Sequence, residues 1–162
     1  RRLDGADGLA VLQRVHDEGI AAVCAEAVGT MERALEITVD YLKQRKQFGV
    51  AIGSFQALQH RAVDMLVMFE QARSMAYFAT MSVAEPETTK RAAAMSAAKV
   101  QIGRSARFVG EQAVQLHGGI GVTEECSVGH YYRRLTLIEI LFGDANHHLA
   151  QLARAGGLDS RA

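Results

Sequence analysis

Proline occurs once in the 162 residues, at Pro86, and tryptophan does not occur at all. Because proline in a helix interior is less favourable than alanine by about 3 kcal/mol, its near absence leaves room for long uninterrupted helices. Residues that favour helices, such as alanine, leucine and glutamine, are plentiful. The composition therefore favours an all-α fold.

Cysteine is also scarce, and long apolar runs are missing. Cys24 and Cys126 lie far apart in the chain and match no spacing typical of a metal site, so they predict reduced thiols rather than a disulfide framework. No apolar run approaches the roughly 18 residues that a membrane-spanning helix needs, and the charged opening at residues 1–4 is unlike a signal peptide. We therefore expect a cytoplasmic protein without membrane insertion.

Charge of one sign does not predominate, because 18 basic and 18 acidic residues give a net charge of zero. No global field would attract the chain to nucleic acid, so no nucleic acid partner is expected. Metal pairs in helical bundles are held by glutamate three residues before histidine, and none of the histidines has one. The nearest approach is Asp144 with His147. The sequence therefore predicts no metal site.

Apolar residues recur at the three- and four-residue spacing of a helix along most of the chain. Helices are expected over the ranges 9–45, 55–84, 88–117, 126–135 and 144–155. Long amphipathic helices joined by connections of a few residues indicate an up-down bundle like a four-helix bundle. We place this bundle domain at residues 8–156, after a tail at 1–7 left by a missing upstream domain and before a C-terminal tail at 157–162.

The helix ends carry their own signals. Ser54 is expected to be the N-cap of the second helix, and Pro86 is expected in the first turn of the third. The glycines of segment 118–121 must end that third helix, because glycine loses the most conformational freedom when it is held helical. Asp144 is expected to cap the last helix.

Two blocks of residues carry a specific resemblance. Residues 41–49 are YLKQRKQFG, followed by Ile52-Gly53 and by FQALQH, and residues 115–121 are QLHGGIG, followed by Tyr132-Arg133. In composition and separation these blocks closely resemble the C-terminal domain of acyl-CoA dehydrogenases. The resemblance extends from about residue 8 to residue 155 and implies two further domains upstream, which hold much of the flavin and of the acyl-CoA.

The resemblance implies FAD as the cofactor, bound partly by six residues of this chain: Arg45, Gln47, Phe48, Gln115, Gly118 and Gly119. By the family pattern Arg45 reaches the diphosphate of an FAD held mainly by a neighbouring subunit, a task suited to a forked guanidinium donor. Some of these residues also have a plainer interpretation. Arg45 could interact with helix-end carbonyls, Phe48 could be a core residue, and the glycines could simply end a helix.

The resemblance also points to a missing catalytic residue. Acyl-CoA dehydrogenases need a carboxylate that removes a proton next to the thioester. Counting from the second block aligns the family's Tyr-Glu-Gly-Thr with residues 141–144, which puts Phe142 at the base position. A minority of members carry the base on the first long helix, where this chain has Gly19. Glu18 is adjacent, but one helical step turns a side chain by about 100°. We therefore expect no catalytic residue in this chain, with Glu18 as a weak substitute.

Asp144 replaces a family threonine that helps to bind FAD, and a carboxylate near a diphosphate would be repelled. The chain therefore resembles the small, non-catalytic subunit of heteromeric bacterial acyl-CoA dehydrogenases, such as those acting on pimeloyl-CoA or steroid side chains. This implies a role in fatty acid metabolism, an acyl-CoA substrate, a homo- or hetero-tetramer and an electron-accepting flavoprotein. The alternative is an oligomerisation module with no direct role in flavin binding.

The remaining polar residues have ordinary interpretations. Solvated faces or weak ion pairs are expected for Arg61, Asp64, Arg73, Lys90 and Arg91. The histidines of the helices are expected to be hydrogen-bonded interface or core side chains rather than ligands: His60, His147 and His148.

Overall fold

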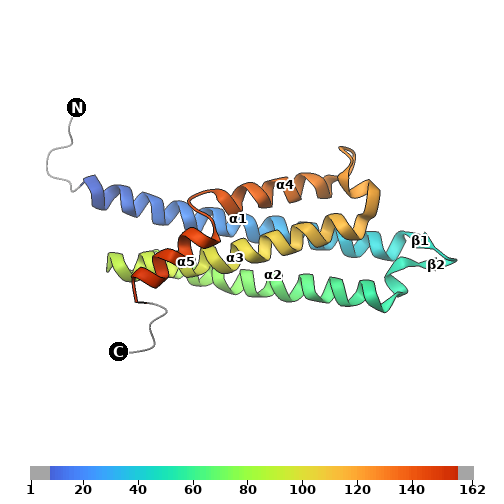
Figure 1. The fold of residues 1–162 in the computed structure, drawn as a ribbon, viewed down its shortest axis with the longest axis horizontal. Helices are drawn as coiled ribbons and strands as arrows, with labels where there is room; N and C mark the ends of the chain where they lie inside the picture. The colour runs from blue at the N-terminus through green and yellow to red at the C-terminus, as the bar shows by residue number, and fades with distance from the viewer. Residues whose placement is uncertain (1–7, 157–162) are drawn as a thin grey trace.

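The computed structural model describes residues 8–156, and both predicted tails, 1–7 and 157–162, lie outside the described residues. The helices are α1 (Gly8–Gln44), α2 (Gln56–Ser82), α3 (Thr88–His117), α4 (Ser127–Ile140) and α5 (Ala145–Arg154). Two short 3-10 helices, η1 (Ile52–Ser54) and η2 (Gly118–Val122), and a hairpin of β1 (Lys46–Gln47) and β2 (Val50–Ala51) complete the fold (Figure 1).

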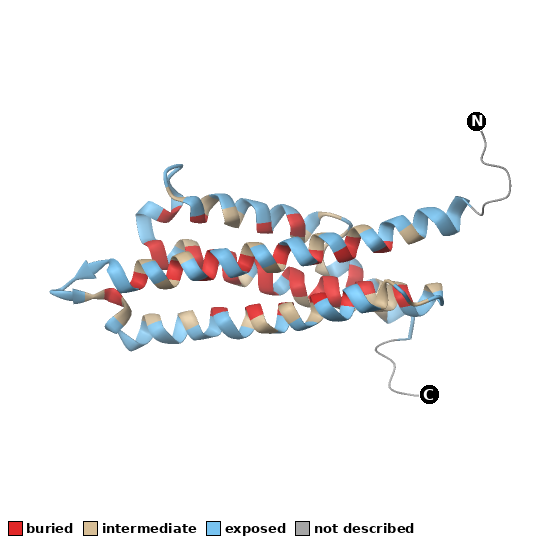
Figure 2. Ribbon diagram, turned by 180° about the vertical axis from the view of Figure 1, so that it is seen from behind, coloured by how far each residue is buried: buried red, intermediate tan, exposed pale blue. Residues whose placement is uncertain are grey.

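The all-α bundle predicted from the sequence is confirmed. α3 is the central helix, because it packs against α1, α2, α4 and α5. Its buried face includes small residues at helical spacing, which allow the neighbouring helices to approach closely: Gly103, Ala106, Gly110 and Ala113. Figure 2 shows the buried residues gathered on the faces that the helices turn toward one another, while much of the outer face of α2 is exposed.

The predicted helix ends are partly right. Asp144 caps α5, since its carboxylate accepts a hydrogen bond of 2.7 Å from the backbone N–H of His147. Ser54 does not cap α2, because it belongs to η1 and its hydroxyl donates to the carbonyl of Ala51. Pro86 also lies outside its predicted position, one residue before the N-cap of α3.

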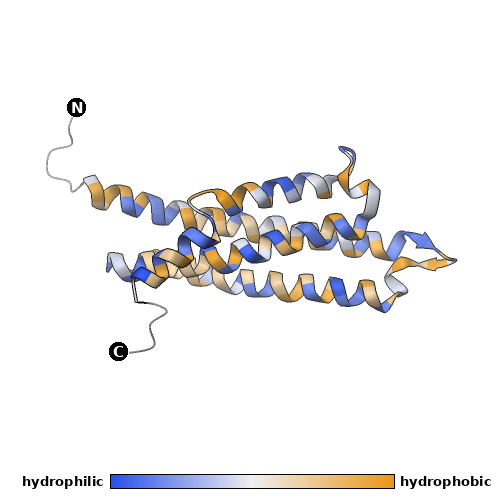
Figure 3. Ribbon diagram, viewed as in Figure 1, coloured by the Kyte–Doolittle hydropathy of each residue, from blue (hydrophilic) through white to orange (hydrophobic). Residues whose placement is uncertain are grey.

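A hairpin replaces the simple loop expected between the first two helices. β1 and β2 pair antiparallel, and the turn between them consists of Phe48 and Gly49, with φ of 55° and 83°. Positive φ at both central residues is the requirement of a type I′ hairpin turn. Figure 3 shows β1 as hydrophilic and β2 as hydrophobic, so the hairpin has one polar and one apolar strand.

No helix within residues 8–156 is long and apolar enough to span a membrane.

Candidate functional site

A cavity of about 740 Å³ lies at the end of the bundle where α1, the hairpin, the start of α2 and the end of α3 meet. This size is typical of small-molecule sites, which measure about 300–1,000 Å³. All six residues predicted from the sequence to bind a cofactor line this cavity: Arg45, Gln47, Phe48, Gln115, Gly118 and Gly119. Residues from two segments about 70 positions apart in the sequence therefore share one site.

Arg45 is the first residue after α1, and the backbone fixes its place. Its N–H donates to the carbonyl of Tyr41, and its own carbonyl accepts from the N–H of Ile52, both at 2.8 Å. The guanidinium is exposed and forms no ion pair within the described part of the chain. The cavity thus has a cation available to an anionic ligand.

Phe48 is not a core residue, because 91% of it is exposed. Its positive φ turns the side chain out of the hairpin, where its ring meets that of Phe55 edge to face at 6.2 Å. Positive φ is unusual for a bulky residue, and residues with such backbone strain are concentrated at active sites and ligand-binding sites. Phe48 therefore offers an aromatic surface at the cavity rather than packing in the bundle.

A stacked pair that the sequence did not predict joins the two segments of the cavity. The rings of Tyr41 and His117 lie 4.4 Å apart with an angle of 24°. The hydroxyl of Tyr41 also donates to the carbonyl of His117 at 3.4 Å, and Nδ1 of His117 donates to the carbonyl of Ala113 at 2.8 Å. Tyr41 belongs to the first motif block and His117 to the second, and this was the only indication in the sequence that they could share a site. Their stacking holds the ends of α1 and α3 together.

The glycines give the cavity a wall of bare backbone. Gly118 has φ of 64°, which a side chain would make strained, and it ends α3 as predicted. Gly119 has open space where a Cβ atom would project. Exposed backbone, one unpaired guanidinium, two glutamine amides and an aromatic ring fit the adenine and diphosphate part of a dinucleotide cofactor. The residues present therefore suit part of a dinucleotide cofactor such as FAD.

Gly19 and Phe142, the two positions that align with the family's catalytic base, lie next to each other although they are about 120 residues apart in the sequence. A Cβ atom added at Gly19 would lie 2.8 Å from Cζ of Phe142, so the phenylalanine ring covers this glycine. Glu18 points elsewhere, since its carboxylate accepts a 2.7 Å hydrogen bond from exposed Arg14. The two aligned positions themselves thus present an aromatic ring and a glycine, and neither supplies a carboxylate.

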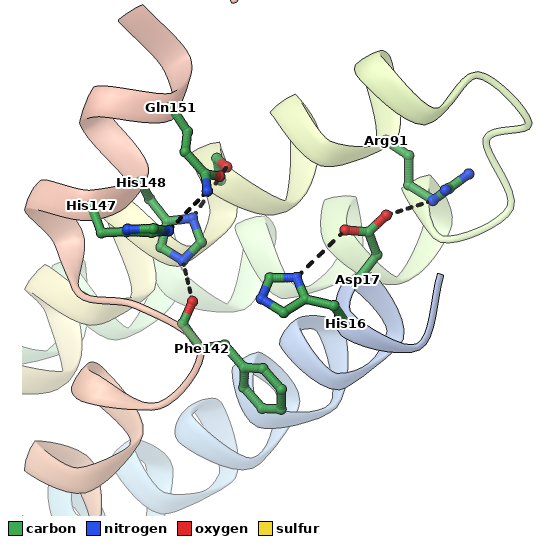
Figure 4. Close-up of polar contacts among 8 residues, drawn as sticks. His16, Asp17, Arg91, Phe142, His147, His148 and Gln151 are labelled. Atoms are coloured by element: carbon green, nitrogen blue, oxygen red, sulfur yellow. Dashed lines mark hydrogen bonds and ion pairs between the residues drawn. The ribbon is translucent and has the colours of Figure 1, made fainter. Parts of the chain in front are cut away.

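Figure 4 shows polar groups around Phe142, of which Asp17, Arg91 and His148 are buried. Arg91 donates to the carboxylate of Asp17 at 2.7 Å, and both side chains are almost fully buried. Arg91 was expected on a solvated face or in a weak ion pair, and this prediction is wrong because the pair is buried. A weak signal existed, because Asp17 lies in the helical register of buried Ile20 and Cys24.

His148 and Lys99 hold the turn between α4 and α5. Nε2 of His148 donates to the carbonyl of Phe142 at 3.1 Å, and Nδ1 pairs with the hydroxyl of Ser96. Burial, helped by the charge of Lys99, lowers the pKa of His148 to about 4, so the ring is neutral at pH 7 as predicted. Lys99, also buried, donates to the carbonyls of Ile138 and Glu139, and its burial lowers its pKa.

The cysteines form no disulfide, and Cys24 is buried against α3. Burial raises the pKa of its thiol to about 11, against the opposing effect of Lys99. His60 is exposed and so does not belong to the core of this chain. Within residues 8–156, no group of three or more histidine, cysteine, aspartate or glutamate side chains is arranged to hold a metal ion.

The fold and the cavity define a helical domain suited to holding one end of a dinucleotide. Residues 6–157 match the family described as "Acyl-CoA dehydrogenase, C-terminal domain", and the chain belongs to that family. Members of the acyl-CoA dehydrogenase family are FAD flavoproteins.

Relatives of this chain include several dehydrogenases. It is 36% identical to acyl-CoA dehydrogenase IpdE2 of Mycolicibacterium smegmatis over 140 residues, which cover 86% of this chain and 43% of that protein. A solved structure of the Tcur3481-Tcur3483 steroid ACAD is similar with a TM-score of 0.82 and 30% identity, over 87% of this chain and 38% of that one. The chain thus spans less than half the length of these relatives.

A two-component assembly is also among the similar structures. The ChsE4-ChsE5 complex from Mycobacterium tuberculosis contains a chain with a TM-score of 0.81 and 25% identity, covering 100% of this chain and 43% of that one.

Proposed function

We propose that this domain belongs to an acyl-CoA dehydrogenase subunit that completes the FAD site of a neighbouring subunit and supplies no catalytic base itself. The observation that carries the proposal is a contrast between two places in the domain, the cavity around Arg45 and the contact between Phe142 and Gly19. Around Arg45 the six expected cofactor residues share one open cavity, whereas at Phe142 and Gly19 both base positions are occupied by residues without a carboxylate.

The distance between these two places supports a site shared between subunits. Gly19 lies in the first third of α1 and Arg45 directly follows its last residue, so at roughly 1.5 Å per residue they are about 40 Å apart along the helix. Figure 1 accordingly shows the hairpin at one end of the bundle and α5 in the opposite half. One flavin dinucleotide is too short to reach both. The cavity at Arg45 would therefore serve a flavin whose reacting ring lies on another chain.

In such an assembly each residue has a limited task. A bound flavin supplies the hydride acceptor for α,β-dehydrogenation of an acyl-CoA. Arg45 binds the diphosphate through its guanidinium, Gln47 and Gln115 offer amide contacts, and the bare backbone of Gly118 and Gly119 allows close approach. The proton is removed by a glutamate of the partner chain, because this domain has none in place.

The assembly itself is proposed to be a tetramer with another acyl-CoA dehydrogenase chain, which passes electrons to an acceptor flavoprotein. A stripe of exposed apolar residues follows one face of α2: Val63, Leu66, Val67, Tyr77, Phe78 and Met81. Large apolar side chains that gather exposed on one helix face favour an interaction surface. Similarity to one chain of the ChsE4-ChsE5 complex supports a heteromeric arrangement. Two unpaired thiols, Cys24 and Cys126, suit a reducing compartment, and we propose the cytoplasm.

The α2 stripe also favours the second candidate function, an oligomerisation module whose flavin contacts are incidental. One experiment separates the two functions. The full-length protein is copurified with its partner, and the absorbance of bound flavin is measured for Arg45→Ala and for Arg33→Ala. Arg33 is a suitable control because it is an exposed arginine of the same helix, paired with Glu36.

We expect the Arg45→Ala assembly to bind flavin at least about tenfold more weakly, in keeping with the loss of a charge-assisted hydrogen bond of about 1.5–3 kcal/mol. The Arg33→Ala assembly should retain its flavin. Full flavin content in an intact Arg45→Ala assembly would favour the oligomerisation module.

A further inference from the structure

The ring of Phe142 occupies the space where a side chain at position 19 would begin. A general base must come within about 3 Å of the proton that it removes. Two alternative base positions that lie in contact with each other must therefore serve the same carbon atom. In this chain the space between them is filled, since a Cβ atom at Gly19 would lie 2.8 Å from Cζ and 3.0 Å from Cε1 of Phe142.

The Phe142 ring is held in this position by its backbone. Phe142 has φ of 61°, and its carbonyl accepts from buried His148. Four and three residues earlier, in the last turn of α4, the carbonyls of Ile138 and Glu139 accept from Lys99 at 2.8 and 2.9 Å. These contacts fix the turn on both sides of Phe142.

Further contacts fix the ring itself. The ring of His16 meets that of Phe142 edge to face at 5.5 Å. The exposed side of Phe142 joins Leu12 and Val15 in lining an apolar groove of about 720 Å³ beside Gly19. The ring therefore forms part of the wall of a groove of ligand size, next to Gly19.

We infer that Phe142 is a specificity-determining residue that excludes an acyl thioester from this chain's own site, because its ring fills the place that the reacting carbons would occupy. The inference rests on the proposed function and goes beyond it. A chain that merely lacked the base would still bind the thioester and hold it unproductively. A chain whose own site is filled by the Phe142 ring does not bind the thioester, which then binds only at the partner's site.

The test counts thioester sites on the full-length protein assembled with its partner. The probes are trans-2-butenoyl-, trans-2-octenoyl- and trans-2-hexadecenoyl-CoA, whose α,β bond is already oxidised. Bound probe is measured by equilibrium dialysis for the wild type and for Phe142→Ala. We expect the number of sites to double in Phe142→Ala with at least one probe. Ile140→Ala, which shortens an exposed apolar side chain just before this turn, should keep the wild-type number.

Equal numbers of sites in the wild type and in Phe142→Ala with every probe would overturn the inference. So would a wild type that already binds one thioester per dehydrogenase chain. Phe142→Leu, which keeps an apolar side chain of smaller bulk, takes the place of Phe142→Ala if that variant does not assemble.

Flavin content distinguishes this failure from failure of the proposed function. If Arg45→Ala loses flavin and Phe142→Ala gains no site, only the exclusion by Phe142 is wrong. If Arg45→Ala keeps its flavin, the shared cofactor site is wrong.

Discussion

Asp17 of α1 and Arg91 of α3 form an ion pair of 2.7 Å in which both side chains are almost completely buried. Arg91 also donates to the carbonyl of Glu85, so the pair joins α1, α3 and the connection between α2 and α3. Because a buried charge without its partner is strongly unfavourable, Asp17→Ala should lower the free energy of unfolding by about 3–5 kcal/mol. Chemical denaturation monitored by circular dichroism measures this change.

Two comparisons make the Asp17 prediction specific. Arg107→Ala, which breaks an exposed pair with Glu111, should leave the denaturation midpoint unchanged. The double variant Asp17→Leu/Arg91→Met should recover much of the loss, because it removes both charges together. A double variant as unstable as Asp17→Ala would show that packing, rather than the unpaired charge, is responsible.

His148 should make the fold sensitive to acid. Its pKa is about 4 in the folded chain, below the ordinary 6.5, because burial disfavours the charged ring. The stability that the neutral ring contributes is complete above pH 6.5 and is lost as the pH falls toward 4. Within this window the free energy of unfolding should fall by up to about 1.4 kcal/mol per pH unit from this group.

Denaturation of His148→Gln across the same pH range tests this origin. The variant should show a shallower pH dependence than the wild type, while His130→Gln, at an exposed position, should follow the wild type. Identical slopes for the wild type and His148→Gln would assign the acid sensitivity to other groups.

Asp144 offers a test of the α5 cap. Its carboxylate satisfies the N–H of His147, one of the backbone donors that a helix start leaves unpaired. Asp144→Ala should therefore lower the free energy of unfolding by about 1 kcal/mol, measured by thermal denaturation. Asp144→Asn, which keeps a capping oxygen, should have a much smaller effect. Equal loss in both variants would mean that the charge, and not the cap, is important.

Glu18 should be dispensable for turnover. Its carboxylate pairs with Arg14 on the exposed side of α1, away from the contact between Gly19 and Phe142. We expect Glu18→Gln in the assembled enzyme to stay within a few fold of the wild type in acyl-CoA-dependent dye reduction. Removal of the partner's glutamate should instead reduce the rate by a factor of about 10² to 10⁴. Loss of flavin reduction in a folded, flavin-containing Glu18→Gln enzyme would identify Glu18 as the base.

The sequence predicts well those features that depend on neighbouring residues. The end of α3 at His117 follows from the glycines after it, and the Asp144 cap follows from residue type at a helix start. The cavity was also predictable, because the two motif blocks named its lining residues together.

Contacts between distant segments outside the two motif blocks were not predictable. Nothing near Arg91 in the sequence indicates that Asp17, 74 residues away, will be its partner. The same is true of Lys99, whose acceptors are carbonyls of a different helix. The hairpin was missed because its strands have only two residues each, too few for an alternating pattern.

The continuity of α1 has a consequence for communication within an assembly. The helix runs without interruption for 37 residues, from the side of the Phe142 contact to the residue before Arg45. Where a helix has no proline and no inserted bulge, it lacks the usual causes of a sharp bend. The angle and distance between the two places are therefore set by the number of residues between them. A single inserted residue would rotate one place against the other by about 100°. A displacement of one end of α1 would therefore reach the other as a shift or rotation of the whole helix, without bending at a hinge.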